Sequence, residues 1–167
     1  MLDLTQGRAA VHRVAYFFLA LIAGAIVSPA CHAEGEAELA RQLLDEAGEN
    51  SGFCVHLGFR NTALTTALSR DGVFLVHGLS QRRAAISTGR AAIRARGLSG
   101  AVSVEHSTLQ RLPYSENLVD LLVAEDLSGQ LDKGPLLDEI VRVLRPGGMA
   151  LLGERSTVGK SVLNTPR

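Results

Sequence analysis

The sequence has few reactive side chains, and their spacing matches no common catalytic pattern. Cys54, His56 and His77 lie in short apolar runs, where a small core cysteine and buried, hydrogen-bonded histidines are expected. Their spacing fits no zinc site, and no serine stands on a nucleophile elbow with histidine and acidic partners. Taken by itself, the turn at residues 58–62 does not indicate a cofactor either. The chemistry must therefore be inferred from the elements that position these residues.

Apolar runs separated by turn residues predict an alternation of strands and helices. The predicted strands span residues 53–58, 73–77, 102–105, 118–124 and 149–152, and the predicted helices span residues 37–47, 65–68, 81–96 and 134–144. Such an alternation requires parallel βαβ units with right-handed crossovers. The predicted fold class is α/β, a doubly wound and mostly parallel sheet. Ligands in such sheets bind outside the carboxyl ends of the strands, near the point where the strand order reverses.

Charge gives no sign of a polyanionic partner. The chain has 17 basic and 17 acidic residues, so its formal net charge is zero. The arginines of the predicted helix 81–96 have no aromatic residues between them, and we interpret them as a solvated helix face. No nucleic-acid partner is expected, and no metal is expected.

The N-terminal segment has the order of a signal peptide. A basic stretch ending at Arg13 precedes an apolar run at residues 14–27, and small residues follow at residues 28–33. The run is shorter than the roughly 20 residues that a spanning helix needs. We expect cleavage after Ala33, export to the periplasm or medium, and no stable membrane span after processing. The alternative is a lipid anchor on Cys31, which small residues precede.

Three segments follow from this organisation. Residues 1–33 are the expected signal peptide, residues 34–153 form one domain, and residues 154–167 form a polar tail that we expect to be mobile. If the leader is removed, Cys54 remains as a single cysteine and no intrachain disulfide can form.

Two blocks of sequence resemble class I S-adenosylmethionine-dependent methyltransferases of the type 11 kind. Residues 112–127 read LPYSENLVDLLVAEDL, and residues 138–152 read DEIVRVLRPGGMALL, in the order and at the distance found in that family. The resemblance extends from about Phe53 to Gly153. It implies a Rossmann-like fold, S-adenosylmethionine as the cofactor, and in-line transfer of its methyl group to a nucleophilic acceptor. The acceptor is unknown, and no catalytic residue is named, because positioning alone supplies much of the acceleration in such a reaction.

The resemblance also places the cofactor, residue by residue. The implied contacts are Gly58, Phe59, Leu79, Ser80, Ser107, Thr108 and Glu125. Several positions depart from the family pattern. His56 stands where the family has an acid, Arg60 and Thr62 replace the second and third glycines, and Ser80 replaces the acid that binds the ribose. Ser107 falls where an acid usually faces the adenine, and Glu105 takes that place if the register slides.

The resemblance ends early, since the family continues with a sixth and a seventh strand. The predicted sheet is therefore incomplete at its C-terminal end, and its last strand is either a bare edge or covered by another segment. A truncated reading frame is an alternative explanation.

The altered loop leaves the enzyme assignment open. A second hypothesis is a catalytically inactive methyltransferase-like module with a binding or structural role. A nicotinamide-dependent oxidoreductase is disfavoured, because the first turn lacks the Gly-x-Gly-x-x-Gly pattern and no acid ends the second strand.

Overall fold

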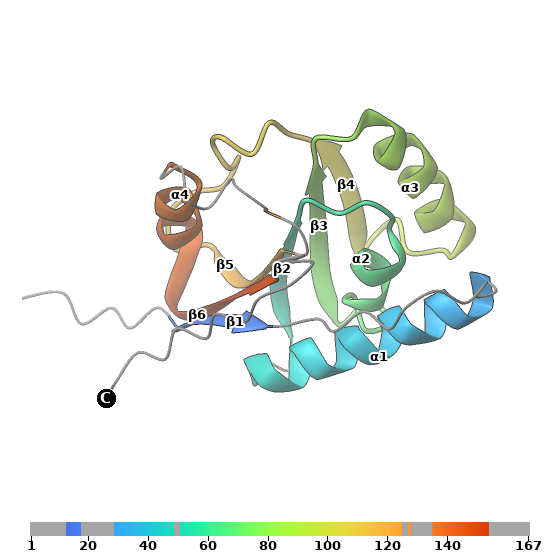
Figure 1. Ribbon diagram of the computed structural model, residues 1–167, viewed down its shortest axis with the longest axis horizontal. Coiled ribbons are helices and arrows are strands. Elements are labelled where there is room, and N and C mark those ends of the chain that lie inside the picture. Colours follow the sequence, from blue (N-terminus) through green and yellow to red (C-terminus); the bar gives the residue numbers. More distant parts are fainter. Residues whose placement is uncertain (1–12, 18–28, 49–50, 125–126, 128–134, 154–167) are drawn as a thin grey trace, which may run out of the picture.

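The structure is a computed structural model that describes residues 13–17, 29–48, 51–124, 127 and 135–153 (Figure 1). The expected tail and Glu125 lie outside these residues. The strands are β1 (Arg13–Phe17), β2 (Gly52–Leu57), β3 (Phe74–Ser80), β4 (Val102–His106), β5 (Val119–Ala124) and β6 (Leu144–Gly153). The helices are α1 (Pro29–Ala47), α2 (Ala63–Ala67), α3 (Arg83–Ala95) and α4 (Pro135–Val143). No helix of this described part is long and apolar enough to cross a membrane.

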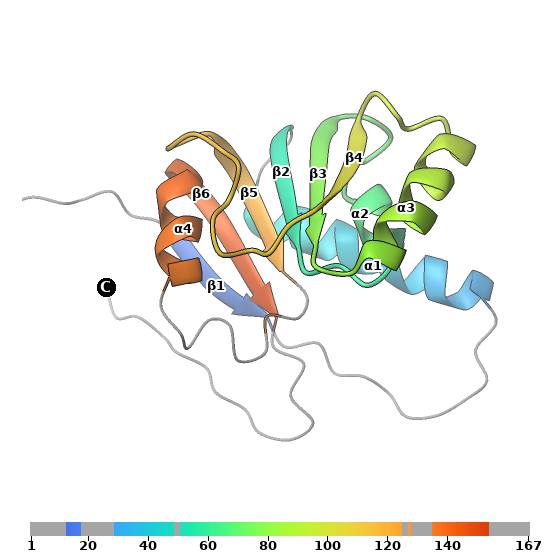
Figure 2. The ribbon, with the colours of Figure 1, turned by 90° about the horizontal axis from the view of Figure 1, so that it is seen from above.

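The strands form one parallel sheet in the order β1-β6-β5-β2-β3-β4 (Figure 2). From β2 the chain moves outward to β3 and β4, then returns to the other side of β2 for β5 and β6. Because crossovers are right-handed, this change of direction moves the connecting helix to the opposite face of the sheet. Helices α1, α2 and α3 accordingly pack on one face and α4 on the other. The predicted doubly wound parallel fold is confirmed.

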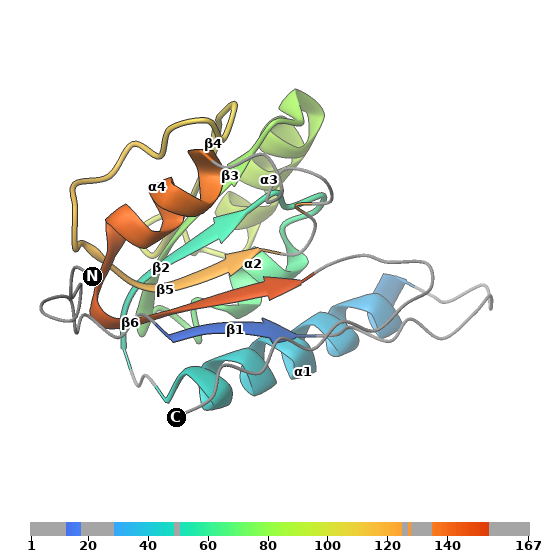
Figure 3. The ribbon, with the colours of Figure 1, turned by 60° about the vertical axis from the view of Figure 1, so that its left-hand side comes forward.

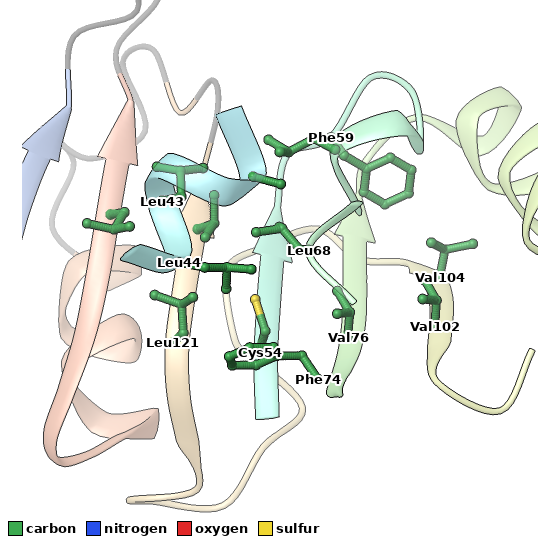
Figure 4. Packing of buried hydrophobic residues seen from close by; sticks show 14 of the residues in the cluster. Leu43, Leu44, Cys54, Phe59, Leu68, Phe74, Val76, Val102, Val104 and Leu121 are labelled. Atoms are coloured by element: carbon green, nitrogen blue, oxygen red, sulfur yellow. The ribbon is translucent and has the colours of Figure 1, made fainter. Parts of the chain in front are cut away.

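Both faces of the central strands are buried, which explains why these strands are apolar at nearly every position. Cys54 points to the face covered by α1 to α3, and Val55 and Leu57 point to the face covered by α4. Figure 4 shows the first face, where Leu43 and Leu44 of α1 pack over the sheet near Cys54. Burial raises the pKa of the Cys54 thiol to about 12. This cysteine is a core residue, as predicted.

The N-terminal residues differ from the expected arrangement. Residues 13–17, which the sequence analysis assigns to a leader, form β1 and pair in parallel with β6, from Arg13 opposite Met149 to Phe17 opposite Gly153 (Figure 3). The last strand is therefore not a bare edge, because β1 satisfies its outward backbone groups. Helix α1 begins at Pro29 rather than at residue 37 and runs through the expected cleavage position.

Two strand boundaries differ from prediction by more than one residue. Strand β3 continues past His77 to Ser80, because pairing with β4 holds Gly78 and its neighbours in extended conformation. Strand β6 begins at Leu144 rather than at Met149, directly after α4. Gly147 has a φ of 81°, and a Cβ on Gly148 would lie 3.0 Å from the carbonyl oxygen of Val119. The two glycines thus permit a sharp reversal pressed against β5.

The two sequence blocks that carry the family resemblance contact each other. Glu139 of α4 accepts a hydrogen bond from the Leu112 N–H at 2.8 Å, and Arg142 donates to the carbonyls of Leu112 and Tyr114 at 3.2 and 2.9 Å. Glu139 and Arg142 also pair with each other at 2.7 Å. We call this group the α4 clamp. The connection between β4 and β5, residues 107–118, contains no helix, and the α4 clamp holds it against α4.

The α4 clamp predicts a pH dependence of stability. The hydrogen bond from Arg142, helped by the Leu112 N–H, lowers the pKa of Glu139 to about 2. The folded state therefore favours the carboxylate, and this stabilisation is fully present above the unfolded pKa of about 4.3 and is lost as pH falls toward 2. Glu139→Gln should lower the free energy of unfolding by about 2 kcal/mol at pH 7 and flatten its decline between pH 4.5 and 2.

Urea denaturation across this pH range measures both effects. Asp138→Asn is the matched control, because it removes an exposed carboxylate one residue away and should change stability by less than ~1 kcal/mol. Equal effects of the two substitutions would contradict the clamp.

Candidate functional site

The carboxyl ends of β2, β3 and β4 are joined to one another by hydrogen bonds. The Gly58 N–H donates to the Leu79 carbonyl at 2.8 Å, and the Ser107 N–H donates to the Ser80 carbonyl at 3.1 Å. The structure thus brings together six of the positions that the resemblance implied, namely Gly58, Phe59, Leu79, Ser80, Ser107 and Thr108. Glu125, the seventh, follows β5 and lies outside the described residues.

The turn after β2 lies where the strand order reverses. In the register of the sheet, Leu57 stands beside Ala124, so the turn at Gly58 lies next to the carboxyl end of β5. Gly58 has a φ of 75°, a conformation that favours glycine and lets the chain leave the sheet at once. This position is the one at which doubly wound sheets bind their ligands.

The Phe59 side chain is not available to a ligand. Its ring is fully buried and lies over β3, with Cε1 3.0 Å from the place where a Cβ on Gly78 would stand (Figure 4). Gly58 and Phe59 are the two predicted contacts in this turn. Phe59 can face a cofactor only through its backbone, because its side chain is buried. Leu79 is also fully buried, and its carbonyl already accepts the Gly58 N–H.

Ser80, which replaces the ribose-binding acid, has its hydroxyl occupied within the protein. The side chain is 1% exposed, and its Oγ donates to the Phe59 carbonyl at 2.8 Å while accepting from the Arg82 N–H at 3.2 Å. A carboxylate at this position could not donate to a carbonyl. Serine therefore ties the β2 turn to the end of β3, where an acid would instead present acceptor oxygens.

The exposed side chain that follows β3 is Gln81, which is not among the site residues predicted from the sequence. Its Nε2 donates to the Thr108 carbonyl at 2.9 Å and so links the ends of β3 and β4. Thr108 is exposed, whereas the Ser107 hydroxyl accepts the Leu109 N–H at 3.1 Å. Gln81 was not predicted because the strand was expected to end at residue 77. The observed strand ends at Ser80, which makes Gln81 the first residue beyond the sheet.

His56 fills the family's acidic position with a neutral side chain. It is fully buried, and its Nδ1 lies 2.9 Å from the Thr65 hydroxyl of α2. Burial lowers the pKa of His56 to about 3, so the imidazole carries no charge near neutral pH. The expected buried, hydrogen-bonded histidine is confirmed.

The two residues that replace family glycines have different surroundings. Arg60 is exposed at the turn, but Thr62 is 8% exposed and points inward. A Cβ on Gly89 of α3 would lie 2.5 Å from the Thr62 methyl group, so this threonine fills the space between the turn and α3. Of these two residues, only Arg60 is exposed to solvent.

A second polar group lies on the α4 side of the sheet, away from the turn. Tyr114 and His77 are hydrogen-bonded at 2.9 Å, and His77 Nε2 lies 3.7 Å from a carboxylate oxygen of Glu105. Burial lowers the pKa of His77 and raises that of Tyr114. Across the described residues, no three His, Cys, Asp or Glu side chains are close enough together to hold a metal ion.

The carboxyl edge can therefore position a ligand through backbone, hydroxyl and amide groups. The Gly58 turn, Gln81, Ser107 and Thr108 offer uncharged hydrogen-bonding groups at this edge, and His106, the last residue of β4, lies at the same edge. Groups of this kind can orient a bound ligand for reaction.

Comparison with known proteins agrees with this geometry. The family model described as a methyltransferase domain matches residues 55–152. The ubiquinone/menaquinone biosynthesis C-methyltransferase UbiE of Idiomarina loihiensis is 34% identical over 82 residues, which are 48% of this chain and 33% of that protein. The match therefore spans about a third of the length of this relative.

Solved structures share the fold at low sequence identity. Geranyl diphosphate C-methyltransferase from Streptomyces coelicolor A3(2), solved with S-adenosyl-L-homocysteine, has a TM-score of 0.62 and 20% identity over 68% of this chain and 43% of its own. The [4+2]-cyclase SpnF has a TM-score of 0.65 and 23% identity over 74% of this chain and 47% of its own.

The matched region runs from the middle of β2 to the end of β6 and includes the turn, both motif blocks and the α4 clamp. The family match supports S-adenosylmethionine as the cofactor. Because the family model covers more than half of the sequence, this chain belongs to the methyltransferase domain family, with the class I fold.

Proposed function

We propose that this chain transfers a methyl group from S-adenosylmethionine to a nucleophilic acceptor that is not yet identified. One observation carries the proposal: the Gly58 turn lies at the reversal of strand order, inside the region that matches the methyltransferase family. Fold similarity alone would not suffice, since SpnF is described as a [4+2]-cyclase. S-adenosylmethionine, when bound, supplies an electrophilic methyl group on a sulfonium centre.

The residues present fit this cofactor in part. The Gly58 turn offers a backbone without a Cβ at the edge, and Gln81 and Thr108 offer polar groups beside it. The ribose anchor is weaker, because the Ser80 hydroxyl is buried and donates to Phe59. A neutral hydrogen bond has roughly half the strength of a charge-assisted one, so we expect weak cofactor binding.

A second candidate is an inactive module that keeps the fold as a binding or structural unit. The hydrogen bond from Ser80 to the Phe59 carbonyl favours it, because this bond holds the β2 turn against β3 where a cofactor would compete for the same groups. The exposed Arg60 at the turn favours it as well.

Calorimetry with S-adenosylhomocysteine tests the first candidate without requiring an acceptor. We expect the native chain to bind S-adenosylhomocysteine weakly. Arg60→Gly should raise the affinity up to tenfold, which is about 1.4 kcal/mol, because glycine removes an exposed side chain from the turn where the ligand would approach the backbone. Arg60→Lys is the matched control. It keeps length and charge and should leave affinity within twofold of the native value.

The outcomes separate the two candidates. Measurable binding by the native chain, together with a higher affinity of the Arg60→Gly variant, would support a cofactor site at this turn. Absence of binding in both proteins, each shown to be folded by circular dichroism, would favour the inactive module.

We also propose that the chain is exported and processed after Ala33. The order of basic, apolar and small residues before Glu34 supports this proposal. Processing there would remove β1 together with the first residues of α1, and β6 would then lose its pairing partner. An added lipid on Cys31 is the alternative form of the same proposal.

Intact-mass spectrometry of the chain expressed in a secreting bacterium measures the processing. We expect an extracytoplasmic product whose mass begins at Glu34. An added lipid mass on Cys31 would indicate a lipid-anchored product instead of a secreted one. A cytoplasmic product that retains residues 1–33 would refute export. Ala33→Tyr, which removes the small residue before the cut, should reduce processing, whereas Ala37→Tyr should not.

A further inference from the structure

Strand β4 is the terminal strand on its side of the described sheet, so one of its edges faces outward. The Val76 N–H donates to the Ala101 carbonyl and the Ser107 N–H to the Ser80 carbonyl, which turns residues 101, 103, 105 and 107 toward β3. The backbone groups of Val102, Val104 and His106 therefore point away from the sheet. This direction agrees with the bond from the Val102 N–H to the Leu98 carbonyl at 2.8 Å.

An arginine side chain lies across this edge. Arg90 of α3 donates from Nε to the outward carbonyl of Val104 at 3.3 Å, a long hydrogen bond. A guanidinium held in this way keeps further donors for a carboxylate. The Val104 N–H and the backbone groups of His106 face the same side as this carbonyl. Val104 as a whole is only 4% exposed, so the Arg90 side chain must move aside before an added strand can pair with it.

Arg90 belongs to a row of three arginines along the edge. Arg83, Arg90 and Arg94 are spaced by seven and four residues, which places them on one stripe of α3 beside its buried residues. Helix α3 packs against β4 and runs antiparallel to it (Figure 2). The row therefore follows the strand edge, and Arg90 and Arg94 line a hollow of about 540 Å³ there.

No acidic residue offsets this row within its own stretch of sequence. Between Asp71 and Glu105 the chain contains five arginines and no aspartate or glutamate. Glu105 is exposed and approaches His77 on the other face of the sheet, and it also lines the hollow that Arg90 and Arg94 line. The arginine row outnumbers this carboxylate, so the edge is basic on balance and this acidic group lies at the side facing away from α3.

We propose that the outward edge of β4 binds an extended acidic peptide segment as an added strand. Val104 and His106 would supply the backbone hydrogen bonds, and alternate side chains of the peptide would present carboxylates to Arg83, Arg90 and Arg94. The side chains between them would face Glu105 and so are uncharged or basic. A peptide carboxylate would draw Arg90 from the Val104 carbonyl and free that acceptor for the added strand.

A second copy of this chain fits the edge less well. Two β4 strands paired about a two-fold axis would place both α3 helices on the same face of the joined sheet. The two arginine rows would then face each other across the junction. Like charges at such a junction oppose association, whereas an acidic partner neutralises the row.

The test uses the full chain and a capped eight-residue peptide that alternates glutamate with threonine. Fluorescence anisotropy should show binding that weakens as salt increases, and NMR hydrogen exchange should show protection of the Val104 and His106 amides. Two further peptides test the two recognition elements. Replacing glutamate by lysine removes the charge match, and N-methylating alternate backbone nitrogens removes the strand pairing. Each change should raise Kd at least tenfold.

Protein variants locate the contact. Arg83→Gln combined with Arg94→Gln should raise Kd for the acidic peptide at least tenfold, with an unchanged circular dichroism spectrum. Arg96→Gln is the matched control. Arg96 directly follows α3 and donates to the Thr66 hydroxyl, away from the arginine row, so this substitution should change Kd less than twofold.

Three results would overturn the proposal. These are no binding of the acidic peptide by the native chain, equal binding of the N-methylated peptide, and equal weakening by Arg96→Gln and by the double variant. A dimer of the free chain that protects the Val104 amide would assign the edge to self-association instead.

Discussion

The reversal of strand order between β2 and β5 is the constraint on which the rest of this molecule depends. Parallel strands need crossovers, and right-handed crossovers place the helices on opposite faces once the direction of travel changes. Both faces of β2 and β5 are then covered, which requires apolar residues at nearly every position. The same reversal leaves the turn at Gly58 beside the end of β5, which is where doubly wound sheets bind their ligands.

What this edge can do depends on a few polar contacts. The chain has the Gly58 turn and the α4 clamp, and it carries the uncharged His56 and Ser80 at two positions where the family resemblance implies an acid. His56 and Ser80 each make a hydrogen bond within the protein. Neither of these two hydrogen bonds involves a ligand, and at the proposed site the cofactor would contact backbone and uncharged groups such as Gln81 and Thr108.

The sequence predicted the architecture well, because it is specified by repeated apolar runs and by turn residues. Five strands and their order of alternation were found, and Gly97 and the Arg-Pro-Gly-Gly segment marked helix ends correctly to within one residue. The details of the site were less accessible. Nothing in the local sequence indicates that Ser80 turns inward to Phe59 or that Thr62 packs on Gly89, since both depend on how α3 approaches the turn. The pairing of residues 13–17 with β6 was missed because an apolar run near the N-terminus has the composition of a leader.

The central claim is that the carboxyl edge around Gly58 is where S-adenosylmethionine binds. NMR chemical-shift mapping with S-adenosylhomocysteine on the ¹⁵N-labelled chain tests it directly. We expect the largest shifts at the amides of Gly58, Phe59, Gln81 and Thr108, with little change at the amino ends of the same strands, at Phe53 and Phe74. Shifts that cluster elsewhere, or none at millimolar ligand, would contradict the assignment of this edge as the cofactor site.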